Sequence, residues 1–318
     1  MYYVRPELAG KSIVVTGAGQ GIGAATAHHL AGLGASVLVA DIVEENAQRT
    51  AALVRESGGR AVACVADVAS WEGAQSVVAT AVEAFGRLDG VVNNAGVLHR
   101  GSPFAEVDGE GARRVFMVNL FGTYCVGVAA MRHMAAHGGG SIVNVTSGVQ
   151  AGMADGASYS ASKGGVASLT YSWALDCQGT GIRVNAVSPV ATTPMTRSTD
   201  EWQRSLGRDV APREEIEPRW NCPPIAYFLS DRSKDVTGQV LRSHGGTLQL
   251  VGHPVVVAPE LTRESWSVAD VAEAVDSVFG AQLPPLGLHA ARVEYVPISK
   301  VNQVPGVEKF AGGARDVE

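Results

Sequence analysis

The chain has 318 residues, a formal net charge of −6 at pH 7 and an isoelectric point near 5.8. This balance gives no electrostatic reason to expect nucleic acid as a partner. We expect no signal peptide, because the first strand follows almost at once, and no membrane span, because no apolar run is long enough to cross a bilayer. The four cysteines, Cys64, Cys125, Cys177 and Cys222, lack metal-ligand spacing. We therefore expect a cytoplasmic protein without a metal site.

Apolar runs and helical patterns alternate along the first 250 residues. Strands are predicted near residues 12–16, 36–40, 61–65, 88–93, 141–146, 183–187 and 238–242. Helices are predicted over residues 22–33, 44–57, 70–85, 110–136 and 157–178. This alternation predicts an α/β fold, in which a doubly wound parallel sheet carries helices on both faces. We predict one domain over residues 1–250 and a C-terminal extension over residues 251–318, with ligands bound beyond the carboxyl ends of the strands.

A glycine-rich segment follows the first predicted strand and opens the first predicted helix. Residues 16–23 read Thr-Gly-Ala-Gly-Gln-Gly-Ile-Gly. Strand, glycine turn and helix in this order are the context of a dinucleotide site. The glycines let the backbone approach the ligand, and the free N–H groups of the helix N-terminus face the pyrophosphate. The segment therefore predicts cofactor contacts from Gly17, Gln20, Gly21, Ile22 and Gly23.

Asp41 ends the second predicted strand, at the offset from the glycines where an acid can bond the ribose hydroxyls of a bound dinucleotide. A carboxylate at this place would repel a 2′-phosphate. No cation stands at Gln20, Ile42 or Val43 to bind that phosphate. Asp41 therefore predicts NAD, rather than NADP, as the cofactor.

Two more motifs follow in chain order. Residues 93–96, Asn-Asn-Ala-Gly, form a turn of small residues after the fourth predicted strand, where backbone can approach a ligand. Tyr159 and Lys163 are four residues apart, so on a helix both side chains share one face. A cation about 4 Å from a phenol favours the phenolate. We therefore expect Lys163 to lower the pKa of Tyr159 from about 10 toward roughly 7, where it exchanges protons near neutral pH.

Together these motifs resemble the short-chain dehydrogenase/reductase family over residues 8–250. The glycine segment, the Asn-Asn-Ala-Gly segment and the Tyr-Lys pair carry the resemblance, and Asn119 and Ser147 complete the family's catalytic tetrad with Tyr159 and Lys163. The resemblance implies a Rossmann-like domain and assembly as a homotetramer or homodimer through the helices predicted at 110–136 and 157–178. It also implies cofactor contacts from Asp67, Val68, Asn94, Ala95, Gly96, Tyr159 and Lys163.

The resemblance implies a role for each member of the tetrad. Tyr159 would exchange a proton with a small-molecule secondary alcohol or ketone, and Ser147 would hydrogen-bond the developing carbonyl oxygen. Lys163 would bind the nicotinamide ribose, and Asn119 would hold a water in a proton relay to Lys163. The sequence departs from the family after the sixth strand, where Val190 replaces the usual glycine. Cofactor contacts from Val190 and Thr193 are expected in that segment.

The residues expected around the substrate are of mixed chemistry. They are Leu98, His99, Val149, Gln150, Met153 and a lid over residues 194–224, in which Trp202 and Trp220 either line the pocket or anchor the core. Without a cluster of Arg or Lys among them, a neutral or bulky secondary alcohol is predicted. Segments 188–196, 236–240 and 245–246 are also similar to a bacterial branch related to the (3R)-hydroxyacyl-CoA dehydrogenase unit of multifunctional enzymes. That branch, and a non-catalytic NAD-binding regulator, are the alternative readings.

The extension contains a second helix signal. Ser267–Asp270 reads as a capping box, and apolar residues recur at Val268, Val271, Val275 and Val278 before Pro284-Pro285 ends the pattern. Burying one valine contributes about 1.5 kcal/mol or more. We therefore expect this stripe to pack near the substrate mouth, on its own domain or on a neighbouring subunit, and to narrow substrate choice.

Overall fold

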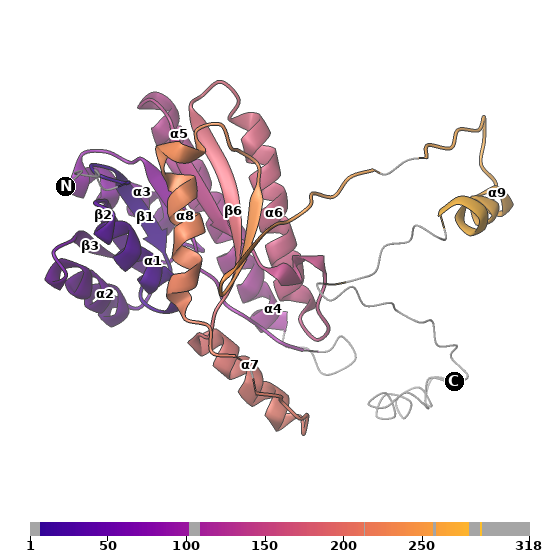
Figure 1. Cartoon of the computed structure of the whole chain (residues 1–318), viewed down its shortest axis with the longest axis horizontal. Helices are drawn as coiled ribbons and strands as arrows, with labels where there is room; N and C mark the ends of the chain where they lie inside the picture. Colours follow the sequence, from indigo (N-terminus) through magenta and orange to yellow (C-terminus); the bar gives the residue numbers. More distant parts are fainter. Residues whose placement is uncertain (1–6, 102–108, 213, 257–258, 280–286, 288–318) are drawn as a thin grey trace.

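The computed structural model describes residues 7–101, 109–212, 214–256, 259–279 and 287. In these residues an eight-stranded sheet has the order β3-β2-β1-β4-β5-β6-β7-β8 (Figure 1). Neighbouring strands run parallel except β7 and β8. The predicted α/β class is therefore confirmed. The strands are β1 Ser12–Thr16, β2 Ser36–Asp41, β3 Arg60–Val65, β4 Gly90–Asn93, β5 Gly140–Val145, β6 Ile182–Val190, β7 Val240–His244 and β8 Thr247–Leu250.

Helices cover both faces of the sheet (Figure 1). One face carries α1 (Gly21–Gly32), α2 (Glu44–Glu56) and α8 (Cys222–Leu229), and the other carries α3 (Trp71–Phe85), α5 (Gly122–Ala136) and α6 (Ala157–Asp176). The sequence of strand β1 is apolar from Ile13 to Val15 because both sides of the strand are buried. Ile13 and Val15 pack into the core of the first face, whereas Val14 packs into that of the second. A parallel strand buried on both faces needs apolar residues at every position.

The sheet ends in a hairpin that the sequence analysis did not predict. Strand β7 begins at Val240, rather than at residue 238, and β8 pairs with it antiparallel from His244↔Thr247 to Leu241↔Leu250. The turn is Gly245-Gly246, and Gly245 has φ of 55°. Two glycines between short apolar runs are a hairpin signal, because the tight two-residue turns require positive φ. These glycines are thus explained by the turn.

The predicted helix at 110–136 is continuous but contains a local change of winding. It consists of α4 (Gly109–Val115), a π-helical segment at Phe116–Phe121 and α5. The run Gly109–Ala136 is long and apolar enough to cross a bilayer by length and composition, so the prediction that no segment has that length is wrong. Its apolar residues here serve the domain core, in which Cys125, Val126, Ala130 and Met134 are buried.

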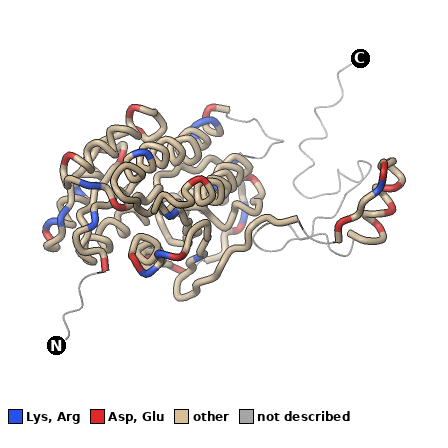
Figure 2. Tube along the Cα trace, turned by 90° about the horizontal axis from the view of Figure 1, so that it is seen from above, with Lys and Arg blue, Asp and Glu red and all other residues tan. Residues whose placement is uncertain are grey.

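The extension forms the predicted helix, but its apolar stripe is not covered. Helix α9 (Val268–Ala274) begins at a capping box between Ser267 and Asp270 and lies apart from the body of the domain (Figures 1 and 2). Val268 is 89% exposed, and Val271 and Val275 are also exposed. The expected packing of the stripe on its own domain is therefore wrong, and packing on a neighbouring subunit stays a prediction. Farther along, the Gly287 N–H donates to the Ala151 carbonyl, 3.1 Å away, and Pro284-Pro285 lies outside the described residues.

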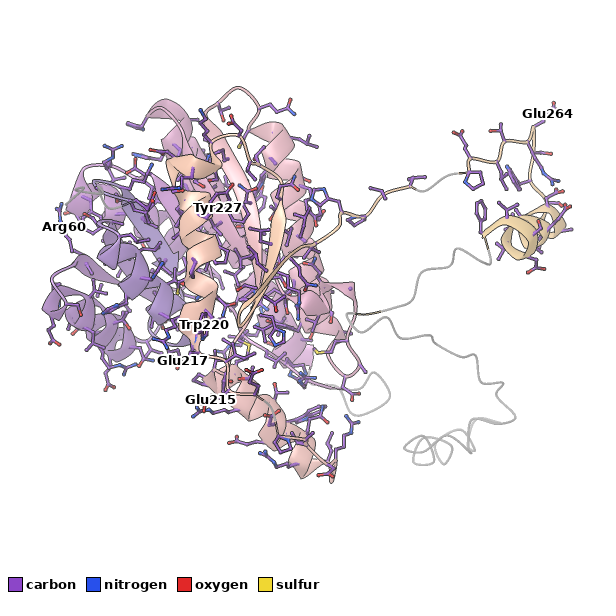
Figure 3. The ribbon with its side chains drawn as sticks, viewed as in Figure 1. Arg60, Glu215, Glu217, Trp220, Tyr227 and Glu264 are labelled. Atoms are coloured by element: carbon purple, nitrogen blue, oxygen red, sulfur yellow. The ribbon has the colours of Figure 1, made fainter. Side chains whose placement is uncertain are left out.

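The predicted lid region contains α7 (Pro194–Ser205) and a short 3-10 turn at Pro218–Asn221 that leads into α8. Thr193 caps α7 through its side chain and forms a capping box with Thr196. Figure 3 shows Trp220 at the foot of α8, with Glu217 and Glu215 following toward α7. Trp220 is exposed, so it is not a core anchor, and neither Trp202 nor Trp220 lines the cavity described below.

We expect Gly127→Ala to destabilise the protein. Helix α5 packs so closely on α6 that a Cβ at Gly127 would lie 2.5 Å from the ring of Trp173, which is itself buried. Overpacking of this kind costs about 1–3 kcal/mol. Thermal unfolding measures the loss. Gly32→Ala is the matched control, because Gly32 is also helical and has open space around it, so an equal fall in Tm for both variants would contradict the explanation.

Candidate active site

One cavity of about 1270 Å³ lies beyond the carboxyl ends of the strands, where the α/β fold places ligands. It is lined by most of the residues predicted to contact a cofactor: Gly17, Gln20, Gly21, Ile22, Asp41, Asp67, Val68, Asn94, Ala95, Gly96, Tyr159, Lys163, Val190 and Thr193. The sequence-predicted residue Gly23 does not line it. A Cβ at Gly23 would lie 2.2 Å from the Gly17 carbonyl oxygen, so this glycine permits close packing of α1 on the loop.

The glycine-rich loop after β1 is hydrogen-bonded to the segment after β4. The Asn94 side-chain amide donates to the carbonyl oxygens of Thr16 (2.9 Å) and Gly17 (3.0 Å). In return, the Thr16 hydroxyl accepts hydrogen bonds from the backbone N–H groups of Asn94 and Ala95, each at 3.0 Å. Thr16 and Asn94 therefore hold together the two backbone segments that flank the cavity. The glycine motif contains Thr16 but does not by itself reveal this role.

Asp41 is held in place beside the same loop. Its Oδ2 accepts the Gly19 N–H at 2.8 Å and its Oδ1 accepts the Val43 N–H at 3.0 Å. A Cβ at Gly19 would lie 2.7 Å from that Oδ2, so the contact requires a glycine. Arg49 lies on the other side of the loop and donates to the Gly19 carbonyl at 3.2 Å. The carboxylate thus lines the cavity at its β2 end with its orientation fixed by backbone.

A dinucleotide fits these features. Gly17 and Gly21 have φ near 60° and carry no side chain into the cavity, so backbone faces the ligand directly. Helix α1 begins at Gly21 without a side-chain cap, which leaves its first N–H groups available to an anion. Acidic side chains stand at the β2 and β3 ends, where Asp41 and Asp67 line the wall. Among the described residues, no group of three or more His, Cys, Asp or Glu side chains is placed to hold a metal.

Tyr159, Lys163 and Ser147 converge at the other end of the cavity. Ser147 directly follows β5, whereas Tyr159 and Lys163 lie one turn apart on α6. The Lys163 Nζ donates to the Val145 carbonyl at 2.7 Å and lies 5.9 Å from the centre of the Tyr159 ring. Burial lowers the pKa of Lys163 to about 8, so the ammonium is still mostly protonated at pH 7.

The pKa of Tyr159 shifts in the opposite direction to the predicted one. Burial raises the pKa above the ordinary value of a phenol, and this effect outweighs the hydrogen bond from Ser147 and the positive charge of Arg100, which lower it. The expected fall toward 7 through Lys163 is therefore wrong for the chain by itself. Desolvation dominates because the helix places the phenol against buried neighbours.

Asn119 is positioned behind the cavity wall. It is fully buried in the π-helical segment and does not line the cavity. Its side-chain oxygen accepts the Val97 N–H at 2.7 Å, and its nitrogen donates to the Val97 carbonyl at 2.9 Å and to the Ser162 hydroxyl at 3.1 Å. The described contacts of Asn119 thus brace the loop after β4 against α6, and its part in a proton relay stays a prediction. π-helical turns are frequent at functional sites.

The residues at the substrate end of the cavity differ from the predicted ones. Leu98, Val149 and Met153 line the cavity as expected, whereas His99 and Gln150 are not part of its wall. Four arginines that sequence reasoning missed, Arg100, Arg113, Arg114 and Arg242, line it as well. Arg100 directly follows the predicted pocket residues, and Arg242 precedes the glycine hairpin at the end of β7. The residues expected around the substrate contained no cluster of Arg or Lys, and these arginines were not among them.

We expect opposite pH dependences for the two directions of a proton transfer at Tyr159. Alcohol oxidation needs the phenolate, and because burial raises the pKa of Tyr159, the phenolate is scarce at neutral pH. The kcat/KM for oxidation should therefore rise with pH from 6 to 8, by up to about tenfold per unit. The rise should flatten as Lys163 loses its charge above about pH 8. Ketone reduction needs the protonated phenol, so it should stay nearly flat from pH 6 to 8 and fall only at higher pH. A flat oxidation profile would contradict this role.

Comparison with known proteins agrees with this geometry. The family model described as short chain dehydrogenase matches residues 11–204. The cis-4-hydroxycyclohexanecarboxylate dehydrogenase of Sinomonas cyclohexanicum is 41% identical over 242 residues, which are 73% of this chain and 94% of that protein. The 2,5-dichloro-2,5-cyclohexadiene-1,4-diol dehydrogenase of Sphingobium indicum is 36% identical over 253 residues, 76% of this chain and 98% of that protein.

A solved structure is similar over more of the chain. The crystal structure of a short chain dehydrogenase from Mycobacterium avium superposes with a TM-score of 0.74 at 32% identity, covering 86% of this chain and 96% of that one. The sheet order, the cavity at the strand ends and the convergence of Ser147, Tyr159 and Lys163 are thus found in a chain whose sequence and fold both match the same family. The chain is a member of the short-chain dehydrogenase/reductase family of oxidoreductases.

Proposed function

We propose that this chain is an NAD-dependent dehydrogenase that interconverts a cyclic secondary alcohol and its ketone. The observation that carries the proposal is the single cavity that joins Asp41 and the glycine loop at one end to Ser147, Tyr159 and Lys163 at the other. The Sinomonas and Sphingobium relatives are dehydrogenases whose names specify hydroxyl groups on six-membered carbon rings. Leu98, Val149 and Met153 supply apolar wall for such a ring.

Each catalytic side chain has a separate role in the proposed reaction. Tyr159 takes the hydroxyl proton of the alcohol, while the Ser147 hydroxyl holds the same oxygen as its carbonyl character develops. Lys163 keeps a positive charge near the phenolate, held by its bond to the Val145 carbonyl. A bound nicotinamide supplies the hydride acceptor. Asn119 donates to the Val97 carbonyl and to the Ser162 hydroxyl, and that hydroxyl donates to the Tyr159 carbonyl at 2.8 Å. These bonds connect the loop after β4 to the turn of α6 that carries Tyr159.

Asp41 is the reason to propose NAD. Its two oxygens already accept backbone N–H groups, so its position beside the cavity does not depend on the ligand. Ribose hydroxyls can donate to the remaining lone pairs of these oxygens. A 2′-phosphate in the same place would put two anions together, and Arg49 is engaged with the loop carbonyl.

A screen of NAD reduction over secondary alcohols tests this function. The panel contains cyclohexanols, cyclic diols, steroids, aryl carbinols and 3-hydroxyacyl-CoA thioesters, with absorbance of the reduced cofactor as the signal. We expect turnover of a cyclic alcohol and loss of that turnover in Tyr159→Phe. Turnover confined to the thioesters would favour the (3R)-hydroxyacyl-CoA reading. NADH binding with no turnover across the panel would favour a non-catalytic NAD-binding protein.

We also propose that the chain assembles as a homotetramer, or failing that as a homodimer. An apolar hollow lies on the π-helical segment and α5 beside α6, lined by Phe116, Met117, Leu120, Phe121, Tyr124 and Leu169. Three of these aromatic side chains, Phe116, Phe121 and Tyr124, are exposed in the single chain. An exposed apolar patch of this kind favours association. Light scattering at micromolar concentration should give a multiple of the 33.0 kDa chain mass, and a monomer would contradict the proposal.

A further inference from the structure

The loop that joins β5 to α6 forms part of the cavity wall at its reacting end. It runs over residues 146–156, and Met153 is one of its residues that line the cavity. Asp155 anchors this loop at two points. Its carbonyl accepts the Gly101 N–H at 3.1 Å, and its carboxylate accepts the Arg208 Nη1 at 2.7 Å. The backbone that carries Met153 is therefore held in place just before the helix of the catalytic residues.

The end of the Met153 side chain lies in a space that exists because residue 156 is a glycine. Gly156 is buried, directly precedes α6 and is not part of the cavity wall. A Cβ on Gly156 would lie 2.1 Å from the Cε of Met153 and 3.6 Å from its sulfur. The methyl group of Met153 therefore occupies the position that any side chain at residue 156 would take. We call this position the Met153 seat.

A methionine can leave this seat at little cost, because its unbranched chain has three rotatable bonds. Met153 already lines the cavity, so a tip displaced from the seat would move into the cavity. Tyr159 lies three residues after Gly156, in the first turn of α6, and lines the same cavity. The position of the Met153 tip therefore determines how much width is left for a substrate beside Tyr159.

From this geometry we propose that Met153 determines the size of the ring that the cavity accepts, and that Gly156 is the positioning residue that keeps the Met153 tip out of the substrate space. The proposal rests on the proposed dehydrogenase function, because it concerns the space in which the alcohol would lie. Adding or removing one methylene group in an apolar pocket changes discrimination by about 10- to 200-fold. With the tip in its seat, the cavity should accept two fused six-membered rings as well as one.

Ketone binding tests the Met153 seat without turnover, because a ketone and oxidised NAD do not react. Calorimetry with the full chain and saturating NAD compares cyclohexanone with 2-decalone, which carries a second fused ring. We expect the ratio of affinities to shift toward 2-decalone by about tenfold or more in Met153→Ala, and toward cyclohexanone by about tenfold in Gly156→Ala. The double variant should match Met153→Ala, because alanine at residue 153 has no methyl group in the seat. Gly164→Ala is the control on α6, since a Cβ there meets only ordinary contacts, and it should keep the ratio.

Three results would overturn the proposal. The first is an unchanged ratio in Met153→Ala, which decides the matter even if Gly156→Ala does not fold. The second is a Gly156→Ala shift that persists in the double variant, because the new side chain would then act through the backbone rather than through Met153. The third is a wild type that binds neither ketone.

Kinetics separate this proposal from the proposed function. If the chain oxidises alcohols with NAD but the variants keep the wild-type ratio, only the role of Met153 fails. If ketone binding follows the expected pattern but no alcohol in the panel is oxidised, the dehydrogenase function fails and the Met153 seat stands.

Discussion

Replacing Tyr159 with phenylalanine is expected to reduce kcat by about 10²- to 10⁴-fold, the range for loss of a positioned general acid/base. The change deletes one hydroxyl from a side chain in the cavity wall and leaves the ring that packs beside Lys163. Nothing at the glycine loop or at Asp41 depends on that hydroxyl. NADH should therefore bind the variant nearly as well as the wild type.

The measurement is steady-state oxidation beside NADH fluorescence titration, with Tyr171→Phe as the matched control. Tyr171 lies on the same helix and packs against His253, 4.2 Å between ring centres, outside the cavity wall. The control should turn over nearly as fast as the wild type. A Tyr159→Phe variant with turnover near that of the control would mean that the proton leaves by another route.

Cofactor choice is the second large effect that we expect. The enzyme should prefer NAD over NADP by about ten- to a thousandfold in kcat/KM, which corresponds to about 1.4–4 kcal/mol for placing a phosphate beside a carboxylate. The Asp41 carboxylate cannot easily move away from a bound 2′-phosphate, because moving it would break its bonds to the Gly19 and Val43 N–H groups. Equal efficiencies with both cofactors would refute the assignment.

Two variants test whether the charge of Asp41, rather than its shape, determines the cofactor preference. Asp41→Asn keeps the size of the side chain and one acceptor oxygen, so it should reduce the preference mainly by improving kcat/KM with NADP. Glu45→Gln is the control, because Glu45 is an exposed acid in the first turn of α2, four residues along the chain. If both variants change the preference equally, the general negative charge of this surface, rather than Asp41, selects the cofactor.

Much of the fold is predictable from the sequence because the residue pattern of each element reflects which of its sides are buried. The middle of strand β1, Ile13-Val14-Val15, is continuously apolar since both of its sides are buried. The glycines after it specify a turn that only a ligand or close packing requires. Strand β8 was missed because it is short and every residue in it is exposed, so no burial pattern marks it. Its signal is the Gly245-Gly246 turn before it.

Prediction was weaker where a property depends on three-dimensional neighbours. The spacing of Tyr159 and Lys163 gives their shared face but not the desolvation that raises the pKa of the phenol. A motif match gives Asn119 but not its position behind the wall, which follows from the π-helical winding of its segment. Arg100 reads as one more loop cation until α7 brings Trp202 against it. Long-range packing decides all three, and no local pattern encodes it.

The most direct test of the proposed reaction follows the hydrogen on the reacting carbon. An alcohol that is active in the screen is deuterated at its carbinol carbon, and the reduced cofactor is analysed by mass spectrometry. We predict that one deuterium appears in each NADH formed, and that Tyr159→Phe slows this transfer without changing the label. Reduced cofactor that carries no deuterium would contradict hydride transfer from a secondary alcohol as the reaction of this chain.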